Sequence, residues 1–459
     1  MFFSVEGRDM VFQNAKNVVL LVDNKKRDLF NSALIAHQLE KQGVTCFLEP
    51  LGAYKAALSA YDPDMIVFNH LTAGHLVEYS KRLARLGVLT AVLPNEGISY
   101  DREDLLYNAG RHHTGAHIDY FFCWNEAHKE ALRECGFDES VHIEVVGVPR
   151  FDFYFDPWAR LFRESRSDGV DRPSVLLCTN FVFSKYQELP ASVGDKFFSK
   201  WKDLLPSHKN YQEVIAVNHR SRTRFFDFAE ALVKEGRYMI TLRPHPSEDI
   251  SVYERWFAGL SPDQKRYCRL DPDSNITSLI LGCDIEISCE TCTTALESWV
   301  AGKPTIELVF ERHPMYFHDD IASLNVLCDT PEDLPDLVEQ QLNMPEQKSF
   351  MEGRVRHLAQ WCNAPNGTSA LQMGNVIASA VFSGERGGKR SYGMNDKRRG
   401  LRLMALKRLG LPYNYDPFLP GKERIFGGRY RIKRFGYEKA IRPSDVAAAR
   451  SLLRSVDTP

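Results

Sequence analysis

Long apolar stretches are missing from this sequence. No segment approaches the roughly 18 to 20 consecutive apolar residues that a membrane-spanning helix needs, and acidic Glu6 and Asp9 precede any apolar core of a secretory signal. A disulfide framework is missing too, because the 10 cysteines are scattered and several lie inside apolar runs, as reduced thiols do. These absences predict a protein of the cytoplasm.

Signatures of cofactor sites are also lacking. The sequence has no G-x-G-x-x-G fingerprint and no P-loop, so a dinucleotide site is not indicated. His112, His113 and His117 cluster, but they have no cysteine or carboxylate partner at a spacing typical of a metal site. Cys289 and Cys292 form a C-x-x-C pair that lies far from the first strand and helix, where a redox motif would be expected. We expect no cofactor and no bound metal.

The 459 residues are too many for one hydrophobic core, and at about 150 residues per domain they predict two or three units. Short runs rich in β-branched and aromatic residues are typical of buried parallel strands. In the first third of the chain these runs are residues 16–23, 64–70, 88–94, 119–124 and 142–147. They alternate with segments of helical apolar spacing, such as 28–43, and therefore predict an open α/β sheet of five strands.

The same alternation starts again after a charged stretch at 160–173. The second set of strand-like runs is 174–180, 238–246, 266–270, 284–288, 304–308 and 325–329. Two Rossmann-like sheets with a cleft between the carboxyl ends of their strands make up the GT-B architecture. We predict an α/β protein of this kind with domains at 1–155 and 156–383, followed by a tail at 384–459.

Arg243 and His245 stand where the predicted strand 238–246 runs into a loop that contains two prolines. An arginine and a histidine at this edge of a sheet can donate hydrogen bonds to a phosphate and neutralise its charge. The alternative is an ordinary exit from a strand. Asn180, at the end of the strand 174–180, is placed to reach the same cleft.

A second candidate phosphate site is the turn before the predicted helix 293–302. Thr291, Thr293 and Thr294 bring hydroxyl groups to the N-terminus of that helix, where unpaired backbone amides favour an anion. Glu297, one turn further on, is a candidate acceptor for ribose hydroxyls. The simpler alternative is a threonine cap on a helix that carries a partly exposed carboxylate.

Several short motifs together resemble the bacterial surface carbohydrate biosynthesis proteins of capsule and O-antigen loci. They are NEG (95–97), VGVPRFD (146–152), TNF (179–181), RPHPSE (243–248), CTTALES (292–298) and GKP (302–304). The resemblance covers about residues 17–345. It extends to the motif pair of bacterial Kdo transferases and sialyltransferases, which use CMP-activated acid sugars.

This resemblance implies roles for particular residues. His245 would contact the nucleotide phosphate, and Glu96 would be the carboxylate that faces it from the other domain. The family pattern has two acidic residues before the glycine, whereas this sequence has Asn95 in the first place. Glu96 is a candidate general base or nucleophile and Asp101 is the substitute candidate; the alternative is that Glu96 and Gly97 form a simple turn.

The implied activity is a metal-independent glycosyltransferase. The first domain would bind a glycan or lipid-linked glycan acceptor, and the second would bind a nucleotide-sugar donor, preferably CMP-linked Kdo or a related acid sugar. Three alternatives stay open. A CDP-glycerol glycerophosphotransferase shares VGVPRFD and RPHP, a nucleotide-sugar 2-epimerase shares the two-sheet architecture, and a non-enzymatic scaffold needs only the fold.

The tail is strongly basic. Residues 384–459 hold 19 Lys or Arg against 7 Asp or Glu, although the whole chain has a net charge of −2. The segments 389–410 and 428–439 mix these cations with leucines and aromatics. Such a composition suits an anionic membrane surface, so we expect a protein peripheral to the inner membrane that does not bind nucleic acid. The alternatives are a nucleic-acid partner and a merely solvated tail.

Overall fold

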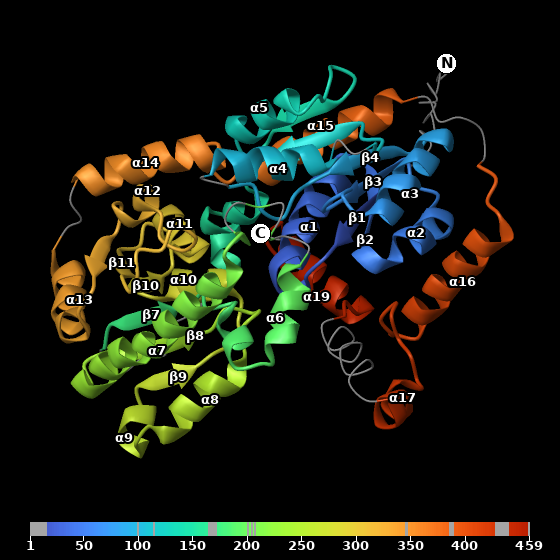
Figure 1. Ribbon diagram of the computed structural model, residues 1–459. Coiled ribbons are helices and arrows are strands. Elements are labelled where there is room, and N and C mark those ends of the chain that lie inside the picture. The colour runs from blue at the N-terminus through green and yellow to red at the C-terminus, as the bar shows by residue number, and fades with distance from the viewer. Residues whose placement is uncertain are drawn as a thin grey trace, which may run out of the picture.

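A computed structural model describes most of the chain in two units, each built on a parallel sheet (Figure 1). The described residues are 16–98, 101–112, 115–163, 172–199, 202, 205, 208–344, 348–384, 390–426 and 440–457. His113 and the segment 428–439, both considered above, lie outside these ranges.

The first sheet has six strands in the order β2-β1-β3-β4-β5-β6. The strands are β1 Lys16–Val22, β2 Val44–Pro50, β3 Met65–Phe68, β4 Leu89–Val92, β5 Tyr120–Cys123 and β6 His142–Val145. The helices between them are α1 Lys25–Glu40, α2 Tyr54–Tyr61, α3 Gly74–Arg85, α4 Arg102–His112 and α5 Glu126–Glu134. The five-strand prediction missed β2, because this edge strand alternates buried and exposed residues and lacks a continuous apolar run.

The second sheet also has six strands, in the order β12-β11-β10-β7-β8-β9. They are β7 Ser174–Cys178, β8 Met239–Arg243, β9 Cys268–Leu270, β10 Ile285–Cys289, β11 Thr305–Leu308 and β12 Val326–Cys328. Its helices are α6 Ala191–Phe198, α7 Tyr211–Glu235, α8 Ile250–Gly259, α9 Pro262–Lys265, α10 Ile276–Gly282, α11 Thr293–Val300, α12 Asp319–Ala322 and α13 Leu334–Asn343. All six strands coincide with the predicted runs.

The segment NHRSRTR (218–224) gathers three arginines and a histidine, and it lies inside α7. Arg220 pairs with Glu311 at the surface, while Arg222 is buried and pairs with Glu188. The two arginines therefore find acidic partners on different faces of one helix. These ion pairs allow this part of the helix to form without apolar residues at helical spacing.

The strands are apolar because helices cover both faces of each sheet. In β3 all four residues are buried, and in β10 all five are. Parallel strands place all their carboxyl ends at one edge of a sheet, and ligands bind in the crevice outside that edge. The loops that follow β4, β7, β8 and β10 therefore carry the candidate site.

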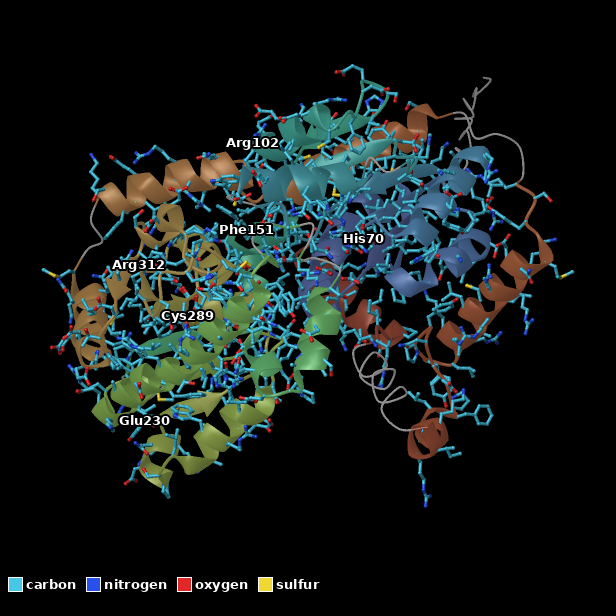
Figure 2. The ribbon with its side chains drawn as sticks, in the orientation of Figure 1. His70, Arg102, Phe151, Glu230, Cys289 and Arg312 are labelled. Atoms are coloured by element: carbon cyan, nitrogen blue, oxygen red, sulfur yellow. The ribbon has the colours of Figure 1, made fainter. Side chains whose placement is uncertain are left out.

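The two units meet in an apolar cluster to which both contribute. Phe151 and Tyr154, from the short 3-10 helix η2 (Pro149–Tyr154), pack there with Leu176 and Leu296 of the second unit. Figure 2 shows Phe151 among the side chains that fill the space between the two ribbons. This packing fixes how the two sheets face each other.

The chain returns to the first unit after α14 Lys348–Cys362. The next helix, α15 Ser369–Ser383, packs against α1, although the prediction assigned residues up to 383 to the second domain (Figure 1). Buried Asp152 explains the attachment, because its carboxylate accepts hydrogen bonds from the Ser369 and Ala370 amides at 3.1 and 2.8 Å. A carboxylate at this position caps the helix N-terminus.

The described parts of the basic tail also pack on the first unit. Helices α16 Met394–Arg408 and α19 Pro443–Arg454 lie against α2 and α1, and α17 Leu419–Phe426 falls between them in the chain (Figure 1). Gly400 allows the close approach of α16, since a Cβ there would lie 3.0 Å from the Ala60 amide nitrogen. Leu403 is buried and the Lys407 ammonium lies 2.5 Å from Glu49. None of the described helices is both long enough and apolar enough to cross a membrane.

Candidate functional site

Two adjoining pockets lie in the cleft between the sheets. The smaller, of about 210 Å³, contains the basic residues Lys26, Arg27, Arg150, Arg243 and His245, and we call it the basic pocket. The larger, of about 1300 Å³, contains the acidic residues Glu96, Asp101, Asp104, Glu290, Asp319 and Asp320, and we call it the acidic pocket. Glu96 and Thr293 line both pockets and so mark their junction.

Every predicted site residue lines one of these pockets. Arg243, His245, Thr294 and Glu297 line the basic pocket, Asp101, Asn180 and Thr291 line the acidic pocket, and Glu96 and Thr293 line both. The ends of the strands thus bring together residues as far apart in the sequence as Glu96 and Glu297. Their chemical roles remain predictions.

Glu248 holds the loop that carries His245. Its Oε1 accepts hydrogen bonds from the Thr179 hydroxyl at 2.7 Å, the Phe181 amide at 3.0 Å and the His245 amide at 3.2 Å. The Tyr253 hydroxyl donates to the other oxygen. Burial raises the pKa of Glu248, and these four donors oppose the rise. The carboxylate therefore joins the loop after β7 to the loop after β8.

The ring of His245 has a defined tautomer when it is neutral. Its Nδ1 accepts a hydrogen bond from the Ser247 amide at 3.1 Å. An accepting Nδ1 leaves the proton on Nε2. Because the ring lines the basic pocket, Nε2 can serve as a hydrogen-bond donor to an anion.

The turn before α11 has an unusual backbone. Glu290 and Thr291 have φ angles of 55° and 44°, in the left-handed region that non-glycine residues rarely adopt. The turn is held by the buried Glu307 carboxylate, which accepts the Thr291 amide at 2.7 Å, and by the Thr291 hydroxyl, which donates to the Tyr316 carbonyl. The hydroxyl of Thr291 is therefore used to shape the turn.

The other two threonines differ in whether the protein engages their hydroxyl groups. The Thr294 hydroxyl donates to buried Glu286 at 2.9 Å, whereas Thr293 is exposed at the start of α11. No side chain caps this helix: its N-cap residue is Cys292, which makes no side-chain cap bond among the described residues. The N-terminus of α11 therefore has no side-chain cap among the described residues, and two of the three threonine hydroxyls are engaged in the protein.

Buried carboxyl groups lie beneath this turn. Burial is the main cause that raises the pKa of Glu286 and Glu290 to about 8 and that of Glu307 to about 7. At neutral pH these groups carry much less negative charge than exposed glutamates do. The neighbouring Cys292 is also buried, which raises its pKa to about 12, so the C-x-x-C pair presents no thiolate.

Glu297 is more engaged than its predicted ribose role suggests. Its side chain is buried, and it accepts a hydrogen bond from the Tyr154 hydroxyl at 2.5 Å and lies 3.3 Å from Arg150 Nε. Both partners come from η2, across the cleft from α11. The Arg150 guanidinium also lies 4.9 Å from the Trp124 ring centroid. Sequence reasoning did not single out Arg150, although it stands inside the VGVPRFD motif.

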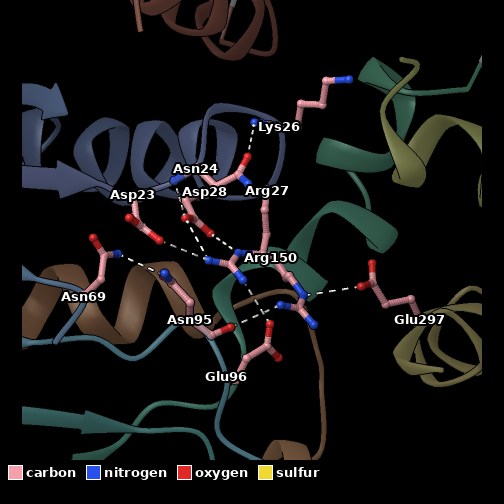
Figure 3. Close-up of polar contacts among 10 residues, drawn as sticks. All are labelled: Asp23, Asn24, Lys26, Arg27, Asp28, Asn69, Asn95, Glu96, Arg150 and Glu297. Atoms are coloured by element: carbon pink, nitrogen blue, oxygen red, sulfur yellow. Dashed lines mark hydrogen bonds and ion pairs between the residues drawn. The ribbon is translucent and has the colours of Figure 1, made fainter. Parts of the chain in front are cut away.

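Figure 3 shows how Glu96 is held. Its carboxylate is exposed and lies 3.2 Å from Arg27 Nη1 of α1. The preceding Asn95 accepts a hydrogen bond from the Asn69 amide at 2.9 Å, and its carbonyl accepts one from Arg150 at 3.4 Å. Asn95 therefore anchors the loop and turns its side chain to Asn69.

Close packing requires a glycine at the third position of the NEG motif. A Cβ on Gly97 would lie 2.4 Å from Cγ of Trp124, so no side chain fits there. Asn125 also holds this position, because its side-chain amide donates to the Gly97 carbonyl at 2.8 Å. The motif thus fixes the backbone next to Glu96.

No protein-family model and no curated protein matches this chain. Among solved structures, S. aureus MnaA in complex with UDP is similar over 82% of this chain and 100% of its own, with a TM-score of 0.51 and 11% identity. UDP-GlcNAc 2-epimerase from Methanocaldococcus jannaschii is similar over 79% of this chain and 99% of its own, at a TM-score of 0.49 and 15% identity. The wall teichoic acid polymerase TagF is similar over 80% of this chain and 89% of its own, at 0.48 and 12%.

The chain has the GT-B fold. Two facing sheets of parallel strands with covering helices confirm the predicted architecture. At 11% identity the likeness to MnaA shows the fold alone. The chemistry has to be argued from the residues of the cleft.

Replacing Glu248 by alanine tests the loop network. The change leaves the Phe181 amide without its acceptor, and an orphaned buried donor costs about 1–3 kcal/mol. We expect unfolding free energy to fall by at least that amount in chemical denaturation. The control is Glu254→Ala, which removes an exposed carboxylate from α8, the helix that follows the Glu248 loop. Equal stability of the two variants would show that Glu248 does not hold the loop.

Proposed function

We propose that the protein is a glycosyltransferase of bacterial surface polysaccharide biosynthesis that binds the nucleotide of its donor in the basic pocket. The observation that carries this proposal is the division of charge across the cleft. Lys26, Arg27, Arg150, Arg243 and His245 line the basic pocket together with the uncapped N-terminus of α11. Such a set suits the phosphate of a nucleotide sugar.

Each phosphate contact has a structural basis. The His245 Nε2 proton is directed by the Ser247 amide on Nδ1, and the first amides of α11 are directed by the turn that Glu307 holds. Arg243, at the end of β8, is buried and is anchored through the Asp271 carbonyl at 3.0 Å. These groups are oriented before any ligand binds, so they can stabilise the charge that develops on the leaving phosphate.

The preferred donor is a CMP-linked acid sugar such as Kdo. Support for this choice comes from the sequence motifs that resemble Kdo transferases. The second candidate is a UDP-sugar enzyme, including the 2-epimerase alternative, and the observation that favours it is the UDP bound to S. aureus MnaA, which has this fold. A CDP-glycerol glycerophosphotransferase ranks third.

Glu96 is our candidate for the catalytic base. It lines both pockets, whereas Asp101 lines only the acidic one and caps α4 through the Asp104 amide at 2.9 Å. In the transfer, the acceptor hydroxyl gives its proton to Glu96 and its oxygen bonds to the anomeric carbon. The bond from that carbon to the phosphate oxygen breaks, and the nucleotide leaves with the electron pair.

We further propose that the tail attaches the protein to the anionic inner face of the membrane. On α16 the residues packed toward α2 include Asp396, Gly400 and Leu403. The opposite face exposes Arg398, Leu401 and Arg408, followed by exposed Phe418, Arg424 and Ile425. Cations next to exposed apolar side chains match a lipid surface, where each cation contributes about 1 kcal/mol. Such an attachment would bring the enzyme to a lipid-linked acceptor.

A nucleotide panel tests the donor site. Ligand binding to the folded state raises the Tm by mass action, so we expect CMP to raise it more than CDP, UDP or GDP, and His245→Ala to reduce the rise. The control is His75→Ala, since His75 is an exposed histidine of α3. A response to UDP alone would favour the second candidate, and a response to CDP alone the third. No response to any nucleotide would refute the proposal.

A Glu96→Gln variant tests the catalytic base. The amide keeps the shape of the side chain but cannot take the acceptor proton, and loss of a general base costs about 10²- to 10⁴-fold in rate. We expect kcat for transfer to fall by this factor while the nucleotide-induced rise in Tm persists. Glu103→Gln changes an exposed carboxylate on neighbouring α4 and serves as the control. If Glu96→Gln keeps the kcat of the wild type, Glu96 is not the base and Asp101 becomes the candidate.

Sedimentation with vesicles tests the membrane surface. We expect the protein to bind vesicles containing phosphatidylglycerol at low salt and to detach as the salt concentration rises. The double variant Arg398→Glu with Arg408→Glu should bind at least tenfold more weakly. The control, Lys234→Glu with Arg255→Glu, makes the same change of charge on exposed residues of the second unit. Equal binding of the two double variants would contradict the assignment to α16.

A further inference from the structure

The acidic pocket is built from both walls of the cleft. Asp101 and Asp104 stand at the start of α4 in the first unit, and Asp319 and Asp320 begin α12 in the second. Lys209 is the one Lys or Arg among the described residues that line the pocket. Carboxylates on both sides therefore face whatever enters it.

Two of the three histidines that line this pocket do little to offset the carboxylates. Burial is the main cause that lowers the pKa of His208 and of His318 below the ordinary value. At neutral pH these rings are therefore mostly uncharged and add hydrogen-bonding capacity rather than positive charge. A negatively charged ligand would meet repulsion here and a neutral one would not.

Glu290 shows that the pocket is prepared for a polar ligand. The residue is 6% exposed and lines the pocket, and its Oε1 accepts no hydrogen bond of ordinary geometry from the described residues. Burial raises the pKa of this carboxyl, and the neighbouring Ser221 hydroxyl opposes the rise. A buried polar atom without a partner destabilises the folded protein. Its presence at the pocket, on a backbone turn with φ of 55°, points to a hydrogen-bond donor supplied by a ligand.

We propose that the acidic pocket receives a carbohydrate acceptor whose bound sugar units are rich in hydroxyl groups and carry no negative charge. This inference rests on the glycosyltransferase function proposed above and specifies its acceptor. Sugar hydroxyls donate hydrogen bonds to carboxylates, and the half-buried rings of Phe183 and Phe317, which also line the pocket, offer apolar surface to the face of a sugar ring. Acceptors with a phosphate or carboxylate on every repeat would be excluded by charge.

A glycan array tests whether the protein excludes negatively charged acceptors. The probes are neutral bacterial oligosaccharides, poly(glycerol phosphate) and polysialic acid, presented to the full-length chain. We expect neutral glycans to be retained and the two polyanions to be retained at least tenfold less, with the difference shrinking as salt rises. Preference for a polyanion, or retention of no glycan at all, would overturn the proposal.

Glu290→Met tests the unpartnered carboxyl. Methionine fills a similar volume without the orphaned oxygen, so we expect the Tm to stay the same or rise while retention of neutral glycans falls at least tenfold. Unchanged retention would overturn the role of Glu290. A second variant, Asp319→Asn with Asp320→Asn, changes exposed residues only and should reduce the discrimination against polyanions. If this variant still retains polyanions as poorly as the wild type does, the exclusion of charged acceptors by these carboxylates would be overturned.

The nucleotide panel, run on the same protein, separates the two proposals. If no nucleotide raises the Tm, the glycosyltransferase function fails whatever the array shows. If a nucleotide raises the Tm and the array retains polyanions, the function stands and the assignment of a neutral acceptor alone is wrong.

Discussion

Arg150 joins the two walls of the site. Its guanidinium lies 3.3 Å from Glu297 on α11 of the second unit and donates to the Asn95 carbonyl, next to Glu96, in the first. A buried ion pair adds little net stability, but removal of one partner costs about 3–5 kcal/mol, because the other charge is left buried. The positions of the α11 N-terminus and of Glu96 therefore depend on the same side chain. An apolar cluster around Phe151 and Leu296 supports this contact and resists a wide separation of the units.

The fold could be predicted from the sequence because its strands are covered on both faces. Strand β3, for example, is buried along its whole length and appears as a continuous apolar run. The edge strand β2 was missed because it mixes buried residues with exposed and partly exposed ones. Its sequence therefore has no continuous apolar run. Arg220 and Arg222 of α7 find their partners on other elements, Glu311 and Glu188, which no local pattern reveals.

The candidate site was predictable in location but not in its contacts. Topology brings the loops after parallel strands to one edge, so His245, the α11 turn and Glu96 could be expected at one cleft. Which threonine hydroxyl is available could not be known from spacing. Thr291 and Thr294 use theirs on Tyr316 and on Glu286. The roles of Arg150 and Glu248 depend on partners 50 or more residues away, such as Glu297 and Thr179, and emerge only once the chain is folded.

Basic and acidic side chains lie in separate parts of the cleft. This separation explains how one site can bind two different substrates. Lysine and arginine side chains gather near the N-terminus of α11, and carboxylates gather beyond Glu96. The glutamates beneath the α11 turn would spoil this division if they were ionised, but burial raises the pKa of Glu286 and Glu307 to about 8 and 7. The floor of the phosphate site therefore carries less negative charge at neutral pH than two exposed glutamates would give it. A donor with a charged end and an acceptor with hydroxyl groups are thereby directed to opposite sides of Glu96, the side chain that lines both pockets.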